Sequence, residues 1–301
     1  MPQDLEPMAS FLALRNQLRV SGTLRTETAL RIGAGRASDV VGNDLPVLRD
    51  ALNAPFLPGA SLKGAMRASL EALIRSVVPG QARDLLETED VMRKRIPELR
   101  KHYFHEGVDT TEADQLYSEA LWRQATTMID QTFGAPWLAG RVAFKDALID
   151  RSLWFGQFEV RNGVALNRDT ETAENGLLYD YEVVPAGLSF DFELLAENME
   201  DWQLGMLLLA LGQWEQGRLR LGGFRSRGLG VVRLVDTHYQ FAKLRSGNVD
   251  DVLRLLCDPT TLAELNIAAE PVDVLQQRTA WIAAFRAELL RRLSPTEAED
   301  A

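Results

Sequence analysis

Two glycine-rich loops carry the side chains best suited to binding a phosphate group. The first, RIGAGR, runs from Arg31 to Arg36, and the second, LGGFRSRGLG, runs from Leu221 to Gly230. Glycine lets the backbone adopt positive φ and lets a ligand approach the main chain closely, and successive N–H groups in such turns bind anions. Arginine adds charge-assisted hydrogen bonds whose geometry matches phosphate. These residue types therefore favour phosphate binding.

We assign phosphate contacts to residues of both loops. They are Arg31, Gly33, Gly35 and Arg36 in the first loop, and Gly222, Gly223, Arg225, Ser226, Arg227 and Gly228 in the second. Either loop alone could be an ordinary tight turn. Because two loops share this composition, a common ligand is the better interpretation.

A helix that we expect to begin at Ser61 adds a third group of donors. Apolar residues recur at helical spacing from Leu62 to Val77. The partial positive charge at a helix N-terminus also favours phosphate. We therefore add Ser61, Lys63 and Arg67 to the predicted site.

The elements that would hold these loops alternate along the chain. The sequence predicts, in order, a strand over 18–32, a helix over 61–77, strands over 141–149 and 181–195, a helix over 201–215 and a strand over 228–236. This βαββαβ order is the split βαβ, ferredoxin-like pattern. We predict an α+β fold in which the strand ends carrying the two glycine-rich loops can lie near each other.

The remaining segments extend this core. Residues 1–236 would form it, with a charged helical insertion at about 80–125, and residues 237–301 would form a C-terminal helical extension. An apolar stripe from Val272 to Leu290 is expected to dock on the main domain; a partner-binding helix is the alternative.

Composition limits the class of protein. The chain has 301 residues, of which 46% are hydrophobic, enough for an ordinary globular core. No run of about 18 uncharged apolar residues exists, so we expect no membrane span, and the N-terminus predicts no export signal. A single cysteine, Cys257, cannot form an internal disulfide or a multi-cysteine zinc site. We therefore expect a cytoplasmic protein.

The charge distribution qualifies the net charge of −10, which by itself argues against a nucleic-acid partner. Five arginines and one acid lie between Arg15 and Arg36, and four arginines and no acid lie between Arg218 and Arg227. Cationic side chains thus concentrate around the glycine-rich loops. The alternative is that these charges only decorate solvated faces.

Several blocks of the sequence resemble the RAMP superfamily. They are LRIGAGR, NDLPVLRD, PFLPGASLKGAMR, ALNRDTETAENGLLYDYEVVPAGLSFDF and LGGFRSRGLGVV, spread over about residues 16–236. More specifically, they resemble the backbone subunits of type III CRISPR effector complexes, with the type III-D branch as one option. The resemblance implies an RRM-like core that binds guide crRNA, pairs with target RNA, and assembles with copies of itself and other effector subunits.

The resemblance also implies a β-hairpin thumb that intrudes into the guide–target duplex. Here the thumb would span about residues 158–181, with Asn167, Arg168, Thr170 and Thr172 as its contact residues. Such a wedge reads duplex shape and leaves sequence specificity to base pairing. An ordinary exposed hairpin is the alternative.

The resemblance places Asp44, in NDLPVLRD, at the position that the family needs for cleaving target RNA. One carboxylate can take a proton or help to hold a divalent cation, for which we expect Mg²⁺. Asp39 and Asp50 are the competing acids. We expect Asp50 to pair with Arg49 or to cap a turn, and Asp39 to be solvated.

The histidines offer weaker signals. His102, His105 and Glu106 have a spacing that could place metal ligands on one helical face, but no further cysteine or histidine is nearby. We expect His238 to be structural. No histidine lies near the glycine-rich loops, which disfavours guide processing by a histidine base.

Three hypotheses follow. The favoured one is a subunit that binds guide RNA and cleaves paired target RNA through Asp44. The second is the same scaffold without cleavage, with Asp44 in a structural role. The third is a ferredoxin-like enzyme acting on a phosphorylated small molecule held by the glycine-rich loops.

Overall fold

A computed structural model describes residues 13–35, 44–105, 110–166, 169, 173–268, 270 and 272–293 of the chain. The strands are β1 (Asn16–Thr26), β2 (Phe56–Leu57), β3 (Val142–Phe144), β4 (Ala147–Leu148), β5 (Glu159–Leu166), β6 (Ala173–Val183), β7 (Ser189–Glu197) and β8 (Val232–Lys243). The α-helices are α1 (Gly59–Val77), α2 (Leu85–Asp90), α3 (Ile96–Tyr103), α4 (Thr110–Ala125), α5 (Met128–Phe133), α6 (Asp201–Glu215), α7 (Val249–Leu256), α8 (Pro259–Glu264) and α9 (Val274–Leu293). Three short turns, η3 (Pro79–Gln81), η4 (Val91–Arg95) and η5 (Arg225–Arg227), complete the described elements.

A four-stranded sheet forms the centre of the molecule. Its strand order is β3-β7-β1-β8, and all neighbouring strands are antiparallel. Alternate residues of β1 and β7, such as Leu18, Val20, Phe190 and Phe192, are buried on one face, as the two-residue period of a half-buried strand requires. The α+β class predicted from the sequence is confirmed.

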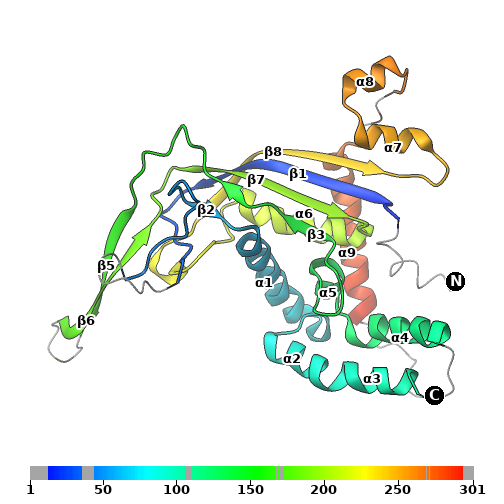
Figure 1. The fold of residues 1–301 in the computed structure, drawn as a ribbon, viewed down its shortest axis with the longest axis horizontal. Coiled ribbons are helices and arrows are strands. Elements are labelled where there is room, and N and C mark those ends of the chain that lie inside the picture. The colour runs from blue at the N-terminus through cyan, green and yellow to red at the C-terminus, as the bar shows by residue number, and fades with distance from the viewer. Residues whose placement is uncertain are drawn as a thin grey trace.

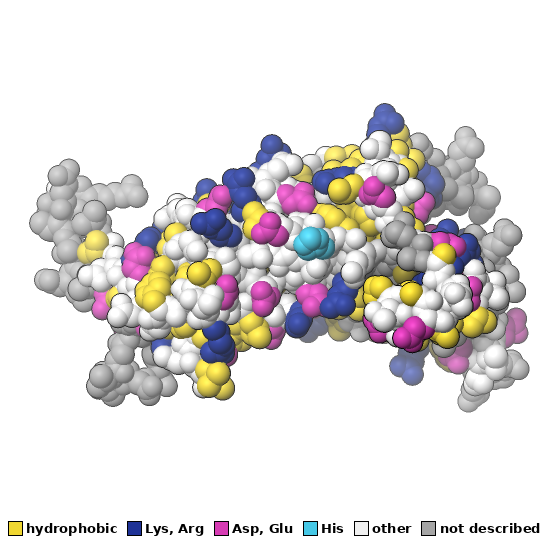
Figure 2. Space-filling view, turned by 90° about the horizontal axis from the view of Figure 1, so that it is seen from above, with side chains coloured by type: hydrophobic (Ala, Val, Ile, Leu, Met, Phe, Trp, Pro, Cys, Tyr) yellow, Lys and Arg dark blue, Asp and Glu magenta, His cyan; other side chains and the backbone are white. Residues whose placement is uncertain are grey.

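Helices α1, α6 and α9 cover one face of this sheet (Figure 1). Leu62, Met66, Leu70 and Ile74 form the buried stripe of α1, while α6 is buried nearly all round because it lies between the sheet and α9. The opposite face of the sheet is open, and Figure 2 shows lysine and arginine beside acidic side chains across it.

The last strand is longer than the sequence predicts. The predicted strand ends at Asp236, but β8 continues to Lys243 through a bulge. Asp236 has φ of 51°, and the extra residue reverses which side chains face inward. Val232 and Leu234 are buried before the bulge, whereas Tyr239 and Phe241 pack on the core after it. The broken alternation explains why the pattern loses the strand at that point.

Two other predicted strands are divided. The segment over 141–149 forms β3 and then β4, which pairs with β2 outside the main sheet. The segment over 181–195 contains the end of β6 and most of β7, separated by a turn in which Gly187 has φ of 84°. Because the apolar pattern is continuous over each segment, the sequence did not indicate the breaks between β3 and β4 and between β6 and β7.

The predicted helical insertion has a small core of its own. Leu99, Ala120 and Ala125 are buried together, with Trp137 packed against them. Asp130 at the start of α5 connects this insertion to α1. Its carboxylate lies 3.2 Å from Arg83 Nη1 and 3.3 Å from Arg67 Nη2.

The C-terminal segment docks on the core. Trp281 of α9 is buried and stacks edge-on against Phe241, with ring centroids 5.1 Å apart. Before it, Arg245 and Arg254 both pair with Asp251, and the hydrogen bond from Arg245 is the main cause that lowers the pKa of Asp251. None of the described helices is both long and apolar enough to cross a membrane.

Candidate nucleic-acid interface

The structure brings the two glycine-rich loops together. Gly223 N donates a hydrogen bond to Arg31 O at 2.8 Å, and Gly230 N donates to Ala29 O at 2.9 Å. Gly222 packs so closely on the first loop that a Cβ atom would lie 2.1 Å from Arg31 O. The predicted proximity of these strand ends is therefore observed. We call residues 31–35 and 222–230 the glycine-loop surface; Arg36 lies outside the described residues.

Arg31 lies partly inside this surface. Its guanidinium sits over the Phe224 ring, 5.2 Å from the centroid, and a Cβ on Gly33 would lie 2.9 Å from its Nη atoms. Its Nε is buried and has no hydrogen-bond partner within the described part of the chain. Burial lowers the pKa of Arg31, and the carboxylate of Glu182 acts against this lowering. Arg31 thus supports the turn as well as adding positive charge to it.

Arg225 and Arg227 are the exposed cations of the surface. They lie in η5, between Phe224 and Gly228, which both adopt left-handed backbone conformations. Arg227 donates a hydrogen bond to Tyr179 Oη, which raises the pKa of Arg227. Neither arginine forms an ion pair with any carboxylate in the described ranges. Their charge is available to an external anion, while Ser226 between them is also exposed.

Helix α1 begins at Gly59 instead of at the predicted Ser61, and its N-terminus binds a carboxylate of the protein itself. The Gly59 N–H at the helix N-terminus donates to Asp146 Oδ1 at 2.7 Å. The Asp146 carboxylate therefore occupies the helix N-terminus, which is where the sequence predicts a phosphate group. The residues that contact this helix end belong to β3 and to the turn between β3 and β4, and not to the glycine-loop surface.

The three predicted donors of α1 have different surroundings. Arg67 is engaged within the protein: Nε pairs with Glu71 at 2.7 Å, and Nη1 donates to Gly134 O at 2.8 Å. Lys63 is half-buried and has no acidic partner among the described residues. Burial, and then the nearby Arg67, lower the pKa of Lys63. Ser61 is half-buried in the first turn. Lys63 is thus the member of this group best able to meet an anion.

Asp44 lies at the base of the β5–β6 hairpin and is exposed. Its Oδ2 accepts a hydrogen bond from Asp180 N at 3.1 Å. The next residue, Leu45, forms a parallel bridge with Tyr181, and Leu45 O accepts from Glu182 N at 3.1 Å. The segment after Asp44 therefore runs along β6, and the carboxylate is not turned into the core.

Aromatic side chains join this hairpin base to the glycine-loop surface. Tyr181 is buried and meets Phe224 edge-on, with centroids 4.8 Å apart. Tyr179 lies above Gly163 of β5, where a Cβ would fall 2.2 Å from the ring. Sequence reasoning missed these aromatics, although the alternation in YDYE and the Phe between glycine and arginine were available signals. Aromatic side chains interleaved with arginine are typical of single-strand binding surfaces.

The competing acids have other places. Asp50 caps a turn by accepting from Leu52 N and Ala54 N, both at 2.9 Å, and the hydrogen bond from Ala54 is the main cause that lowers its pKa. Of the two roles predicted for Asp50, the turn cap is thus confirmed, and its ion-pair partner is Arg151, at 2.6 Å, instead of Arg49. Asp39 lies outside the described residues.

A hairpin of β5 and β6 lies where the thumb is predicted and projects away from the sheet (Figure 1). The predicted contact residues at its tip, Asn167, Arg168, Thr170 and Thr172, lie outside the described part of the chain. Their role stays a prediction.

The histidine spacing of the insertion, a weak signal for metal binding in the sequence, can be compared with the structure only in part. His102 packs edge-on against Tyr103, and Glu106 lies outside the described residues. Within the described residues no group of three His, Cys, Asp or Glu could hold a metal ion. His238 is an exposed residue inside β8, opposite Ser21.

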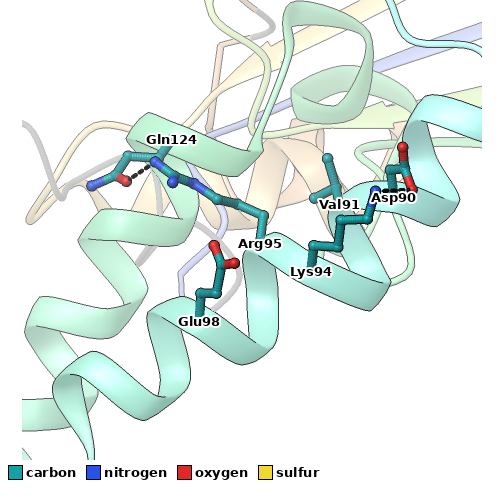
Figure 3. Close-up of a pocket in the computed structure, with 6 residues that line it drawn as sticks. All are labelled: Asp90, Val91, Lys94, Arg95, Glu98 and Gln124. Atoms are coloured by element: carbon teal, nitrogen blue, oxygen red, sulfur yellow. Dashed lines mark hydrogen bonds and ion pairs between the residues drawn. The ribbon is translucent and has the colours of Figure 1, made fainter.

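An open hollow in the insertion is lined by charged and polar side chains of both signs. Asp90, Val91, Lys94, Arg95, Glu98 and Gln124 line it (Figure 3). Lys94 pairs with Asp90 at 3.0 Å, and Arg95 donates to Gln124 at 2.5 Å. Because it lies in the helical insertion and is lined by acidic as well as basic side chains, it does not extend the glycine-loop surface.

Comparison with known proteins places these features in a family context. A family model described as the RAMP superfamily matches residues 23–233. A protein named CRISPR system Cms endoribonuclease Csm3, from Enterococcus italicus, is 25% identical over 73% of this chain and 90% of its own length. Proteins of the same name match shorter stretches: that of Methanocaldococcus jannaschii is 39% identical over 20% of this chain and 25% of its own length, and that of Mycobacterium tuberculosis is 45% identical over 18% and 24%.

Proposed function

Since this chain belongs to the RAMP superfamily, we propose that it is a backbone subunit of a type III CRISPR effector complex. In this role it binds guide crRNA, assembles with copies of itself and with other effector subunits, and cleaves the target RNA that pairs with the guide. The subtype is left open, with type III-D as one option.

One observation carries this proposal. Two exposed arginines that have no acidic partner among the described residues, Arg225 and Arg227, lie on a surface that is joined through Tyr181 and Phe224 to the segment carrying Asp44. A cationic, glycine-rich turn suits the backbone of one RNA strand. An exposed carboxylate close by suits chemistry on a second strand.

The sheet itself is a poor candidate for the RNA path. We take the four-stranded core as RRM-like, and RRM sheets stack bases on exposed aromatic side chains. Here the open face of the sheet instead carries ion pairs such as Arg19–Glu193 at 2.8 Å and Lys145–Glu193 at 3.4 Å, consistent with the mixed charges in Figure 2. We therefore place the guide along the glycine-loop surface and the target beside the hairpin.

The hairpin supplies the geometry that cleavage needs. In this reaction the 2′-hydroxyl oxygen attacks the adjacent phosphorus and its proton passes to a base. The bond from phosphorus to the 5′-oxygen breaks, which leaves a 2′,3′-cyclic phosphate and a 5′-hydroxyl that takes its proton from water. This attack requires an in-line arrangement that a paired A-form strand does not offer. A hairpin wedged into the duplex would splay one nucleotide and allow it. In this proposal Asp44 takes the proton or holds a divalent cation beside the scissile phosphate.

The residues at Asp44 fit a weakly held Mg²⁺. This ion is commonly bound by one or two carboxylates, with water and substrate phosphates as the other ligands. Asp44 Oδ2 already accepts the Asp180 N–H, which leaves Oδ1 of Asp44 as a ligand. When bound, the cation would neutralise charge that develops on the phosphorane.

The decisive experiment compares Asp44→Ala with wild type in the assembled, guide-loaded complex. We expect single-turnover cleavage of a guide-matched target to fall about 100-fold or more, the scale of a lost general base, while target affinity is unchanged. Asp191→Ala removes an exposed carboxylate of β7 and is the matched control.

The other outcomes identify the alternatives. Cleavage by Asp44→Ala at the wild-type rate would refute this assignment of the site. Guide binding without metal-dependent cleavage by wild type would indicate a non-catalytic scaffold. If the purified protein carries no RNA and binds none at low salt, the enzyme of a phosphorylated small molecule becomes the better hypothesis.

A further inference from the structure

Five residues after Asp44, Arg49 forms an ion pair with Glu182 of β6. Arg49 Nη2 lies 2.5 Å from Glu182 Oε2, and the same oxygen accepts from Val47 N at 3.1 Å. We propose that Arg49 and Glu182 are positioning residues, which clamp the segment after Asp44 onto β6 and thereby aim the Asp44 carboxylate at the target strand. This inference rests on the proposed function.

The clamp is built on both sides of the hairpin base. The Arg49 guanidinium stacks over the Phe158 ring, 4.1 Å from its centroid, just before β5. Its ion-pair partner Glu182 lies in β6 and is only 8% exposed. A planar guanidinium that is stacked and paired at once has little rotational freedom. Arg49 therefore connects the segment after Asp44 both to β6 and to the residue just before β5.

The backbone carries this restraint to Asp44. Val47 N binds the Glu182 side chain, Leu45 O accepts from Glu182 N, and Asp44 Oδ2 accepts from Asp180 N. These contacts alternate along both segments like the bonds of a short parallel ladder. The clamp closes one end of this ladder, and the exposed Asp44 lies at the other end.

A restraint of this kind matters because Asp44 is exposed. Without the clamp, the Asp44 carboxylate would be held by its single hydrogen bond and the Leu45 backbone contacts. In-line attack depends on sub-ångström placement, and a displacement of about 1 Å can cost on the order of 100-fold in rate. The clamp also makes Asp44 and the hairpin one body, so that a hairpin seated in the duplex brings the carboxylate with it.

The test uses Arg49→Gln, Glu182→Gln and the double variant in the assembled complex. We expect each single variant to lower the single-turnover cleavage rate at saturating target by roughly 10- to 100-fold, with target affinity unchanged. The double variant should be no slower than the slower single variant, because both changes remove one contact. Arg49→Lys, which keeps the charge but loses the planar fork, should recover part of the rate.

Arg151→Gln is the matched control. It removes an ion pair to the same segment, Arg151–Asp50 at 2.6 Å, that does not contact β6. Its cleavage rate should equal that of wild type. A thermal melt of each variant separates unfolding from misplacement, and the double variant, which removes both charges of the Arg49–Glu182 pair, serves if a single variant is unstable.

A second measurement does not depend on cleavage. Hydrogen exchange of the Val47, Asp180 and Glu182 amides should become faster in Arg49→Gln and stay unchanged in Arg151→Gln. If wild type cleaves, Asp44→Ala does not, and the clamp variants cleave at the wild-type rate, the inference is overturned. If wild type does not cleave at all, the proposed function fails, and unchanged amide exchange in Arg49→Gln would then overturn the clamp as well.

Discussion

Single residues of the glycine-loop surface divide into those that shape it and those that leave room for a ligand. Gly222 has φ of 74°, and a Cβ there would lie 2.1 Å from Arg31 O, so its residue type is explained by loop packing. Gly228 has φ of 86° with nothing within 4 Å of an added Cβ. The open space at Gly228, which directly follows the exposed Arg227, leaves room for a phosphate to approach the backbone.

Alanine at these two positions should therefore have different costs. Gly222→Ala should lower the free energy of unfolding by about 2–4 kcal/mol, since left-handed strain adds to a backbone clash. Gly228→Ala should cost only about 1–2 kcal/mol from the left-handed conformation alone. Urea unfolding of the two purified variants measures both values. Equal costs would contradict the tight seating of Gly222 on Arg31.

At the scale of elements, the position of α9 depends on one glycine of α6. A Cβ on Gly205 would lie 2.0 Å from the Trp281 carbonyl oxygen, so the two helices are in contact through their backbones. Such close approach explains why the C-terminal segment is part of the core. On the same helix, an added Cβ at Gly212 would meet the flexible ends of two side chains, Arg278 Nη2 at 3.1 Å and Glu215 Oε2 at 3.8 Å.

Alanine should accordingly have opposite effects at these two helical glycines. Gly205→Ala must displace α9 and should destabilise the protein by about 1–3 kcal/mol. Gly212→Ala can be accommodated by rotation of Arg278 and should stabilise by up to about 1 kcal/mol, because alanine favours the helix. Thermal melts of both variants check the signs. A stable Gly205→Ala protein would show that the α6–α9 contact is looser than the structure has it.

At the scale of the whole molecule, the net charge of −10 opposes RNA binding by the isolated chain. The described cations are mostly paired with acids, as in Arg245–Asp251 and Arg233–Glu27. Arg225 and Arg227 are exposed exceptions. We therefore expect the isolated subunit to bind RNA more weakly than the assembled complex, in which neighbouring subunits extend the cationic surface.

The salt dependence of RNA binding should identify these two arginines. Filter binding of single-stranded RNA to the complex should give a plot of log K against log salt whose slope falls in magnitude by roughly 1.4 in Arg225→Gln/Arg227→Gln, about 0.7 for each lost phosphate contact. Arg218→Gln removes an exposed arginine just after α6 and should leave the slope unchanged. An unchanged slope in the double variant would remove the glycine-loop surface from the RNA path.

The candidate site was predictable where the signal was local. Glycine and the strand order predicted that the two loops would lie together, which the structure confirms, whereas Asp44 was singled out by the resemblance of NDLPVLRD to a family motif and its role stays a prediction. The role of Arg67 was harder to predict, because a helix position says nothing about the distant Asp130 and Gly134 that receive its guanidinium. The carboxylate of Asp146 at the α1 N-terminus comes from 87 residues away, so no local pattern could indicate it.

The sequence by itself determined the α+β class, the limits of α6 and the composition of the glycine-rich loops, because periodicity and residue type act over a few neighbouring residues. Only the tertiary structure decided that Arg31 would stack on Phe224, that Glu182 would pair with Arg49, and that β8 would continue past Asp236. Each of these depends on which side chains from distant segments compete for one buried space, and that competition is settled only when the chain is packed.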